Sequence, residues 1–204
     1  MKLVIATTNK HKLAEYRRLL PRHKLITLKK PPAVNENGKT LRANAVLKAK
    51  AHAKLTPLPV LADDTGLFVE YLQGRPGLRS ARWTNGDFGK ARANILRSLT
   101  GVAKARRTAR FECVIAWYEP KTKNLKTFAG KCDGLISQSE QGSTGFGYDS
   151  IFFEAKLGQT FGQVRPEQKD RVSHRARALR KLKNYLKMRL SLWFTLTMLN
   201  WPGF

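Results

Sequence analysis

Cysteine is scarce in this sequence, with only Cys113 and Cys132 among 204 residues. The two form no CxxC pair, and no histidine lies near them in the sequence to complete a zinc ligand set. This excludes a disulfide-stapled scaffold and a zinc module. We expect two reduced thiols in a cytoplasmic protein.

Long hydrophobic runs are also missing. The first apolar run, Leu3–Ala6, is too short for a signal peptide, and the charge-free run Leu190–Phe204 is shorter than the roughly 20 residues that span a bilayer. We therefore expect neither secretion nor a membrane partner. For an apolar tail over residues 188–204, three explanations stay open: it covers a dimer surface, it packs back on the core, or it is a frameshift artefact.

Acidic residues are few: 14 Asp and Glu stand against 39 Lys and Arg, for a formal net charge of +25. Such a field attracts polyanions and depends on ionic strength, so nucleotides and nucleic acid both fit. A 42% apolar and 9% aromatic content is ordinary for a globular enzyme and excludes a fully disordered chain. No repeat or low-complexity linker divides the chain, and we expect one domain over residues 1–187.

Hydrophobic periodicity predicts a mixed α/β fold. Helices are expected over Leu13–Leu20, Thr40–Leu55 and Phe88–Leu99, the third capped by Asp87, and from Ser173 onward. Strands are expected over Leu3–Ala6, Val60–Ala62, Leu67–Leu72 and Ile151–Phe153, and Phe111–Trp117 with Leu125–Cys132 should form an antiparallel hairpin.

Two adjacent carboxylates, Asp63 and Asp64, follow the predicted strand Val60–Ala62, which would place them at a strand end beside a cleft. Neighbouring negative charges repel and Asp is a poor strand former, so the pair needs a physical reason. A bound Mg²⁺ would supply one, because it takes one or two carboxylates together with phosphate oxygens. A solvated turn, with one Asp acting as a cap, is the alternative.

The segment Thr7–Lys12, TTNKHK, lies between a predicted strand and a predicted helix. Free backbone N–H groups and the positive dipole end of a helix suit a phosphate there, although any surface helix could begin this way. In the next predicted helix, Asn44 and Lys48 are four residues apart and share one face.

The Gly-rich loop Gly142–Asp149 matches neither a Walker pattern nor a dinucleotide fingerprint. Its Phe146 and Tyr148 could stack on a base or fill the core. Ser173-His174-Arg175 combines a helix cap, a titratable ring and a fork of donors, but in isolation a surface helix with basic residues is the favoured explanation.

Five segments in this order resemble the inosine triphosphate pyrophosphatase family, also called Ham1-like: ATTNKHKLAEY, NAVLKAKA, LADDTGLFVEYLQGRPGLRSAR, GFGYDSIFF and VSHRARAL. The resemblance runs from Leu3 to about Leu186. It implies a long mixed β-sheet flanked by helices, with two lobes around a central substrate cleft. It also implies a cytoplasmic, Mg²⁺-dependent homodimer that hydrolyses ITP, dITP and XTP to the monophosphate and pyrophosphate, by attack of an activated water on the α-phosphorus.

The resemblance also implies residue roles. Asp64 would be the general base and, with Asp63 and Glu36, a metal ligand. The implied substrate-binding residues are Thr7, Thr8, Asn9, Lys10, His11, Lys12 and Lys48 at the phosphates, Thr65 at the nucleotide, Phe146, Gly147, Tyr148 and Asp149 at the base, and Lys169, His174 and Arg175 completing the pocket. Donors such as His174 and Arg175 could serve the purine O6, and Asp149 could accept from N1–H, so that adenine leaves buried groups unpaired.

Two positions depart from the resemblance. Ala43 stands where a Glu is common, which would thin the carboxylate shell around the metal, and Ser150 replaces a usual Pro, which would loosen the base-binding loop. Two other functions stay open. The chain could be a basic nucleic-acid-binding protein on the same scaffold, with nucleic acid otherwise a charge-driven side interaction, or a pyrophosphatase for modified pyrimidine triphosphates.

Overall fold

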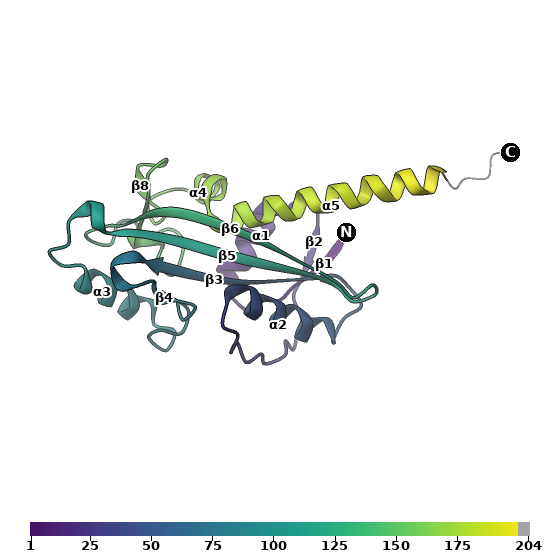
Figure 1. Cartoon of the computed structure of the whole chain (residues 1–204), viewed down its shortest axis with the longest axis horizontal. Coiled ribbons are helices and arrows are strands. Elements are labelled where there is room, and N and C mark those ends of the chain that lie inside the picture. Colours follow the sequence, from purple (N-terminus) through teal and green to yellow (C-terminus); the bar gives the residue numbers. More distant parts are fainter. Residues whose placement is uncertain (200–204) are drawn as a thin grey trace.

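The computed structural model describes the backbone of residues 1–199 and the side chains of residues 1–189. Within this part, eight strands form one sheet in the order β2-β1-β3-β5-β6-β7-β8, with β4 paired to β3 (Figure 1). The strands are β1 (Lys2–Ile5), β2 (Lys24–Ile26), β3 (Val60–Val69), β4 (Arg75–Gly77), β5 (Thr108–Glu119), β6 (Asn124–Ile136), β7 (Phe152–Glu154) and β8 (Gln159–Thr160). The helices are α1 (Lys10–Leu19), α2 (Leu41–Ala53), α3 (Phe88–Ser98), α4 (Pro166–Val172) and α5 (His174–Leu199).

The sheet is mixed, as predicted. Strand β1 runs parallel to both β2 and β3, whereas β3, β5, β6, β7 and β8 pair antiparallel in succession. The predicted hairpin is confirmed, because β5 and β6 pair along their length from Glu119↔Asn124 at the turn to Thr108↔Leu135. The predicted fold class, a long mixed sheet flanked by helices, is therefore correct.

The prediction of two strands on either side of Asp63-Asp64 is wrong. Strand β3 runs unbroken from Val60 to Val69 and pairs with β5 throughout, with Asp63 opposite Ile115 and Asp64 opposite Val114. The carboxylates thus lie mid-strand, not at a strand end or in a solvated turn, and they are only 2% and 8% exposed. The two aspartates interrupt the apolar pattern of the sequence, but in the folded protein cations from other elements neutralise their charges, so the strand continues.

A smaller correction concerns the segment after the Gly-rich loop. Residues Asp149–Ile151 form a 3-10 turn, and the strand predicted over Ile151–Phe153 begins one residue later as β7. The backbone N–H of Phe152 donates to the carbonyl of Asp149 and closes the turn, and the Asp149 carboxylate accepts the backbone N–H of Phe146 at 2.8 Å. Likewise, the strand predicted to reach Leu72 ends at Val69 and a 3-10 turn follows.

Side-chain caps fix the starts of α1, α2 and α3. Asn9 Oδ1 accepts from the backbone N–H groups of His11 and Lys12, Thr40 Oγ1 accepts from Ala43, and Asp87 Oδ1 accepts from Lys90. Each cap satisfies donors that the first helical turn leaves free.

Three apolar clusters hold these elements together. One lies between the sheet, α1 and α5 and includes Tyr16, Trp117 and Leu182; a second lies under α2, on the opposite face; the third fills the end near α3 and includes Phe111 and Phe152. Helices α5 and α2 cover opposite faces of the sheet in Figure 1. The predicted apolar stripe of α5 is confirmed by buried Ala178, Leu179 and Leu182.

Helix α5 comes unusually close to the sheet where it begins. A Cβ on Gly130 of β6 would lie 2.1 Å from the carbonyl oxygen of His174 and 2.5 Å from the backbone nitrogen of Ala178. Glycine at this position therefore lets the start of α5 lie directly on β6. In the described part of the chain, no helix is both long and apolar enough to cross a membrane. Of the predicted apolar tail over residues 188–204, side chains are described only for Met188 and Arg189, so the three explanations for it lie outside the described residues.

Candidate active site

The two central carboxylates serve opposite faces of the sheet. Successive side chains of a strand alternate between its faces, so Asp63 turns toward α1 and α5 while Asp64 turns toward α2. Their hydrogen-bond partners come from these helices: Lys12 and Arg175 for Asp63, and Asn44 and Lys48 for Asp64. The adjacent charges are therefore held apart by separate sets of partners.

Asp64 is oriented by two donors on α2. Its Oδ2 accepts from Asn44 Nδ2 at 3.0 Å and its Oδ1 from Lys48 Nζ at 3.3 Å, and the same Nζ donates to Glu36 Oε2 at 3.0 Å. Asn44 also accepts the N–H of Gly38 at 2.8 Å, which fixes the loop that carries Glu36. The expected shared face of Asn44 and Lys48 is confirmed. Burial raises the pKa of Asp64 against the lowering effect of Lys48.

Asp63 is buried among cations. Its Oδ2 accepts from Lys12 Nζ at 2.9 Å, from Arg175 Nη2 at 3.1 Å and from Thr65 Oγ1 at 3.1 Å. Burial alone would raise the pKa of Asp63, but the charges of Lys12 and Arg175 hold it well below its usual value. Asp63 is therefore a permanent anion that fixes the direction of both cations.

Glu15, on α1, joins this site to the base-binding loop and is absent from the predicted site. It forms ion pairs with Arg175 and, at 2.8 Å, with Lys169, whose Nζ also donates to Asp149 at 2.6 Å. The result is an unbroken chain of alternating charges from Lys12 to Asp149. The sequence held one clue, because Glu15 is the only acid in the basic helix Lys10–Leu19.

The Gly-rich loop closes the other end of the cavity. Asp149 is buried and its Oδ2 receives both Lys169 Nζ and the Phe146 N–H. Gly145 has φ +79°, and a Cβ there would lie 2.2 Å from Asp149 Oδ2, so only glycine allows this close approach. Tyr148 is tied down too, since its hydroxyl donates to the backbone carbonyl of Ser80 at 2.8 Å.

His174 forms an aromatic wall of the cavity. Its ring stacks on Phe111 with centroids 4.6 Å apart and an interplanar angle of 20°. Burial and the nearby charges of Arg175 and Lys169 hold the pKa of His174 well below its usual value, so the ring is neutral. Within the described residues, its Nδ1 has no hydrogen-bond partner, which leaves a buried polar atom for a ligand.

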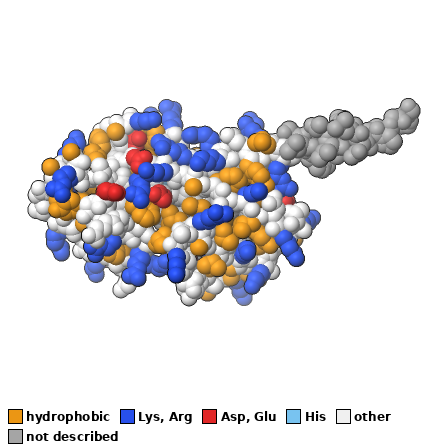
Figure 2. Space-filling model, viewed as in Figure 1, with side chains coloured by type: hydrophobic (Ala, Val, Ile, Leu, Met, Phe, Trp, Pro, Cys, Tyr) orange, Lys and Arg blue, Asp and Glu red, His pale blue; other side chains and the backbone are white. Residues whose placement is uncertain are grey.

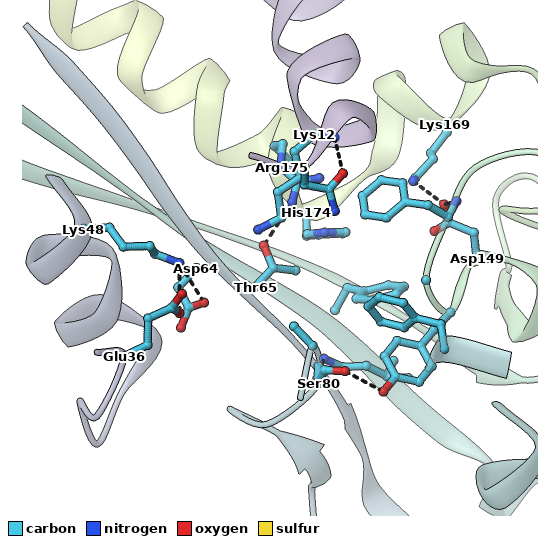
Figure 3. A pocket seen from close by; sticks show the side chains of 18 residues that line it. Lys12, Glu36, Lys48, Asp64, Thr65, Ser80, Asp149, Lys169, His174 and Arg175 are labelled. Atoms are coloured by element: carbon cyan, nitrogen blue, oxygen red, sulfur yellow. Dashed lines mark hydrogen bonds and ion pairs between the residues drawn. The ribbon is translucent and has the colours of Figure 1, made fainter. Parts of the chain in front are cut away.

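One cavity brings most of the predicted site residues together (Figure 3). In Figure 3, Asp64, Glu36 and Lys48 group at one side and Asp149 with Lys169 at the other, with Thr65, Lys12 and Arg175 between them. The predicted residues that line it are Asn9, Lys12, Glu36, Lys48, Asp64, Thr65, Phe146, Gly147, Tyr148, Asp149, Lys169, His174 and Arg175.

The remaining predicted residues lie around this cavity. Thr7, Thr8 and Asp63 line an adjoining hollow that shares Asn9, Lys12, Glu36 and Lys48 with it. His11 stacks on Phe146 with ring centroids 5.2 Å apart, whereas Lys10 lines a further hollow beside Leu28, which shares Thr7, Thr8 and Asn9 with the adjoining one. The structure thus does not bring Lys10 to the main cavity.

The main cavity also has lining residues that the sequence did not single out. These are Leu67, Ser80, Ala81, Phe88 and Phe111. Each sits at a position typical of a strand, turn or helix start, so no local pattern distinguishes them from core residues.

Comparisons with known proteins agree with this architecture. The family model described as Ham1 family matches residues 3–185. The chain belongs to the Ham1 family. It is 42% identical over 187 residues to a dITP/XTP pyrophosphatase of Geobacillus kaustophilus, covering 88% of this chain and 91% of the relative.

Solved Ham1 structures share the fold. The Ham1 protein of Staphylococcus aureus is 36% identical with a TM-score of 0.81, covering 93% of this chain and 100% of that one. A HAM1 protein from Coxiella burnetii is 34% identical with a TM-score of 0.82, covering 92% of this chain and 99% of that one.

The two departures from the Ham1 pattern have different surroundings. A Cβ on Gly38 would lie 2.7 Å from the Cβ of Ala43, so the small residue at 43 packs directly on the loop after Glu36. Ser150 Oγ donates to Glu140 at 2.9 Å, and Arg92 pairs with the same carboxylate at 2.7 Å. Hydrogen bonds therefore tie down the loop that lacks the expected proline.

Proposed function

We propose that this chain hydrolyses the non-standard purine nucleoside triphosphates ITP, dITP and XTP to the nucleoside monophosphate and pyrophosphate. The observation that carries the proposal is the cavity with two chemically different ends. One end gathers Lys48 and the carboxylates of Asp64 and Glu36; the other is an aromatic slot with a buried carboxylate, Asp149, and Lys12 lies between the two. A triphosphate suits the first end and a flat, polar base the second.

The carboxylates near Lys48 fit a divalent metal, and we propose Mg²⁺. Glu36 and Asp64 both reach the same Nζ, at 3.0 and 3.3 Å, so their oxygens converge. In the described residues there is no group of three or more acidic, His or Cys side chains that could hold a metal. Proteins nevertheless usually bind Mg²⁺ through only one or two carboxylates, and the substrate phosphates supply further oxygen ligands. When bound, the ion would polarise the phosphates and offset charge that develops during hydrolysis.

The metal role predicted for Asp63 stays a prediction, and its contacts favour another task. Its Oδ2 already binds Lys12, Arg175 and Thr65. We propose that Asp63 positions Lys12, whose ammonium then faces the phosphates. Lys12 and Lys48 would approach the triphosphate from opposite faces of the sheet.

The chemical step is assigned to Asp64. A water oxygen attacks the α-phosphorus, the bond from that phosphorus to the oxygen bridging the β-phosphate breaks, and pyrophosphate leaves with this oxygen. The proton of the water passes to the Asp64 carboxylate, whose raised pKa favours accepting it. Asn44 and Lys48 hold the carboxylate in place during the transfer.

The base is recognised by its 6-keto edge. Asp149 uses Oδ2 for Lys169 and Phe146, and a carboxylate has about four acceptor positions, so it retains capacity to accept N1–H. The terminal nitrogens of Arg175 are held by Glu15, Asp63 and Thr65, so the neutral ring of His174 is the better candidate donor to O6. Adenine has an acceptor at N1 and a donor at its 6-amino group, so it would offer no N–H to Asp149 and no acceptor to His174.

The decisive experiment is a panel of triphosphates assayed for pyrophosphate release with and without Mg²⁺. We expect ITP, dITP and XTP to be hydrolysed far faster than ATP, GTP or modified pyrimidine triphosphates, and chelation to stop the reaction. Asp64→Asn should lower kcat by roughly 10²–10⁴-fold with an unchanged circular dichroism spectrum. Wild-type turnover in that variant would refute the assignment of the base. From the resemblance we also propose a cytoplasmic homodimer built from the domain 1–187.

A further inference from the structure

The surface of this protein is more positive than its composition suggests. Five of the 14 acidic residues are buried, namely Glu15, Asp63, Asp64, Asp149 and Glu154, but only three of the 39 basic residues, Arg107, Lys169 and Arg175. Figure 2 shows Lys and Arg side chains spread over one face of the molecule, with Asp and Glu at only a few points. Folding therefore removes anions from the surface and leaves the cations there.

Helix α5 concentrates this charge in one row. Arg180, Lys183 and Lys187 follow each other at helical spacing beside the buried stripe of Leu179 and Leu182; Arg180 and Lys187 are exposed and Lys183 is half-buried. We call these three residues the α5 ridge. Within the described residues none of them forms an ion pair; Arg180 donates instead to the backbone carbonyl of Arg171 at 3.2 Å.

The α5 ridge destabilises the isolated protein. Like charges three or four residues apart destabilise a helix. Burial lowers the pKa of Lys183, and the charges of Arg180 and Lys187 lower it further, so the three cations repel one another. The helix dipole does not compensate, since its effect is confined to the last turn and α5 ends at Leu199.

The ridge continues onto the neighbouring helix. The turn after α1 brings His23 close to Lys183. The pKa of His23 is lowered mainly by burial, and the charges of the N-terminal amine and of Lys183 lower it further. Arg17 and Arg22, at the end of α1 and in this turn, are exposed. An extended positive surface thus runs from α5 to α1, outside the cavity described above.

We propose that the α5 ridge and the adjoining end of α1 bind the phosphate backbone of nucleic acid without reading its sequence. Cations about 4.5 to 6 Å apart along a helix axis suit an extended polyanion. Among described side chains, the large exposed hydrophobics are scattered over Met1, Leu47, Leu55, Tyr71 and Met188, and only Met188 lies on α5. Among the side chains described up to residue 189, the ridge therefore adjoins neither an aromatic platform for stacking bases nor an apolar face for entering a lipid bilayer.

The test compares two variants of equal charge in the full chain. The ridge variant is Arg180→Glu with Lys183→Glu and Lys187→Glu. The control variant is Arg42→Glu with Lys50→Glu and Lys54→Glu, exposed residues on or directly after α2, which covers the opposite face of the sheet. Fluorescence anisotropy would follow binding of a labelled single strand and a duplex of about 20 nucleotides over a range of salt concentrations, with circular dichroism and ITP hydrolysis as checks on folding.

For wild type we expect binding at about 150 mM salt, weakening steeply as salt rises. The ridge variant should bind at least about tenfold more weakly. Its plot of log K against log salt concentration should also be less steep by about 2 to 3, because each phosphate contact contributes roughly 0.7–0.9 to that slope. The control variant should stay within about threefold of wild type.

Two results would overturn the proposal: no wild-type binding at that salt concentration, or equal weakening in both variants. The proposal is independent of the enzymatic one, because neither variant changes a residue of the cavity. If the wild-type protein hydrolysed none of the triphosphates, the binding experiment could still support or refute the α5 ridge.

Discussion

Glu15 offers the sharpest test of the buried charge network, because the change Glu15→Gln keeps the shape of the side chain and removes only its charge. Burial raises the pKa of Glu15, but Arg175 and Lys169 more than offset this and lower it to about 2, against 4.5 for a free carboxyl. A shift of this size corresponds to about 3 kcal/mol in the free energy of unfolding. Its removal leaves two buried cations each short of a partner.

The sign of the pH dependence follows from the depressed pKa. The contribution of Glu15 is fully present well above pH 4.5, and it is lost as the pH falls toward 2. Urea unfolding of wild type and Glu15→Gln should therefore differ by about 3 kcal/mol at pH 7 and by less than half of this near pH 3. Because other groups titrate in both proteins, the difference between the two isolates Glu15.

A control variant makes this measurement specific. Glu167 is exposed on α4, so Glu167→Gln should change the free energy of unfolding by about 0.5 kcal/mol or less. A loss below about 1 kcal/mol for Glu15→Gln at pH 7, or a loss that does not change with pH, would refute the reasoning that ion pairing of Glu15 stabilises the fold.

Two glycines give further predictions. Gly130→Ala should destabilise the fold by about 1–3 kcal/mol in thermal or urea unfolding, because its Cβ would push the backbone of α5 off the sheet. Gly89→Ala, at an exposed position of α3, should change the stability by about 1 kcal/mol or less. Equal effects of the two would contradict the close packing. Gly145→Ala should raise the KM for ITP more than it lowers kcat, since the new Cβ displaces Asp149 at the base end and leaves Asp64 untouched; a pure kcat effect in steady-state assays would argue against a base-binding role.

Local patterns were sufficient for most of the elements. The caps Asn9, Thr40 and Asp87, the apolar stripe of α5 and the β5–β6 hairpin all follow from residues close together in sequence. Such features depend on backbone groups and periodicities within one element, so a sequence contains the information that specifies them. The order of five motifs likewise identified the Ham1 family before any distance was known.

Long-range contacts decided what the sequence left open. The Asp63-Asp64 pair interrupts an apolar strand locally, yet β3 is continuous because Lys12, Lys48 and Arg175 arrive from three helices to neutralise it. The same holds for Glu15, which becomes a buried link between Arg175 and Lys169 only when α1 meets the start of α5 and α4. The sequence by itself determined four of the helices, the β5–β6 hairpin and the family, but not β2, β4, β8, α4 or the continuity of β3. The tertiary structure decided which face each carboxylate serves, because the energy of a charge depends on neighbours that only folding brings together.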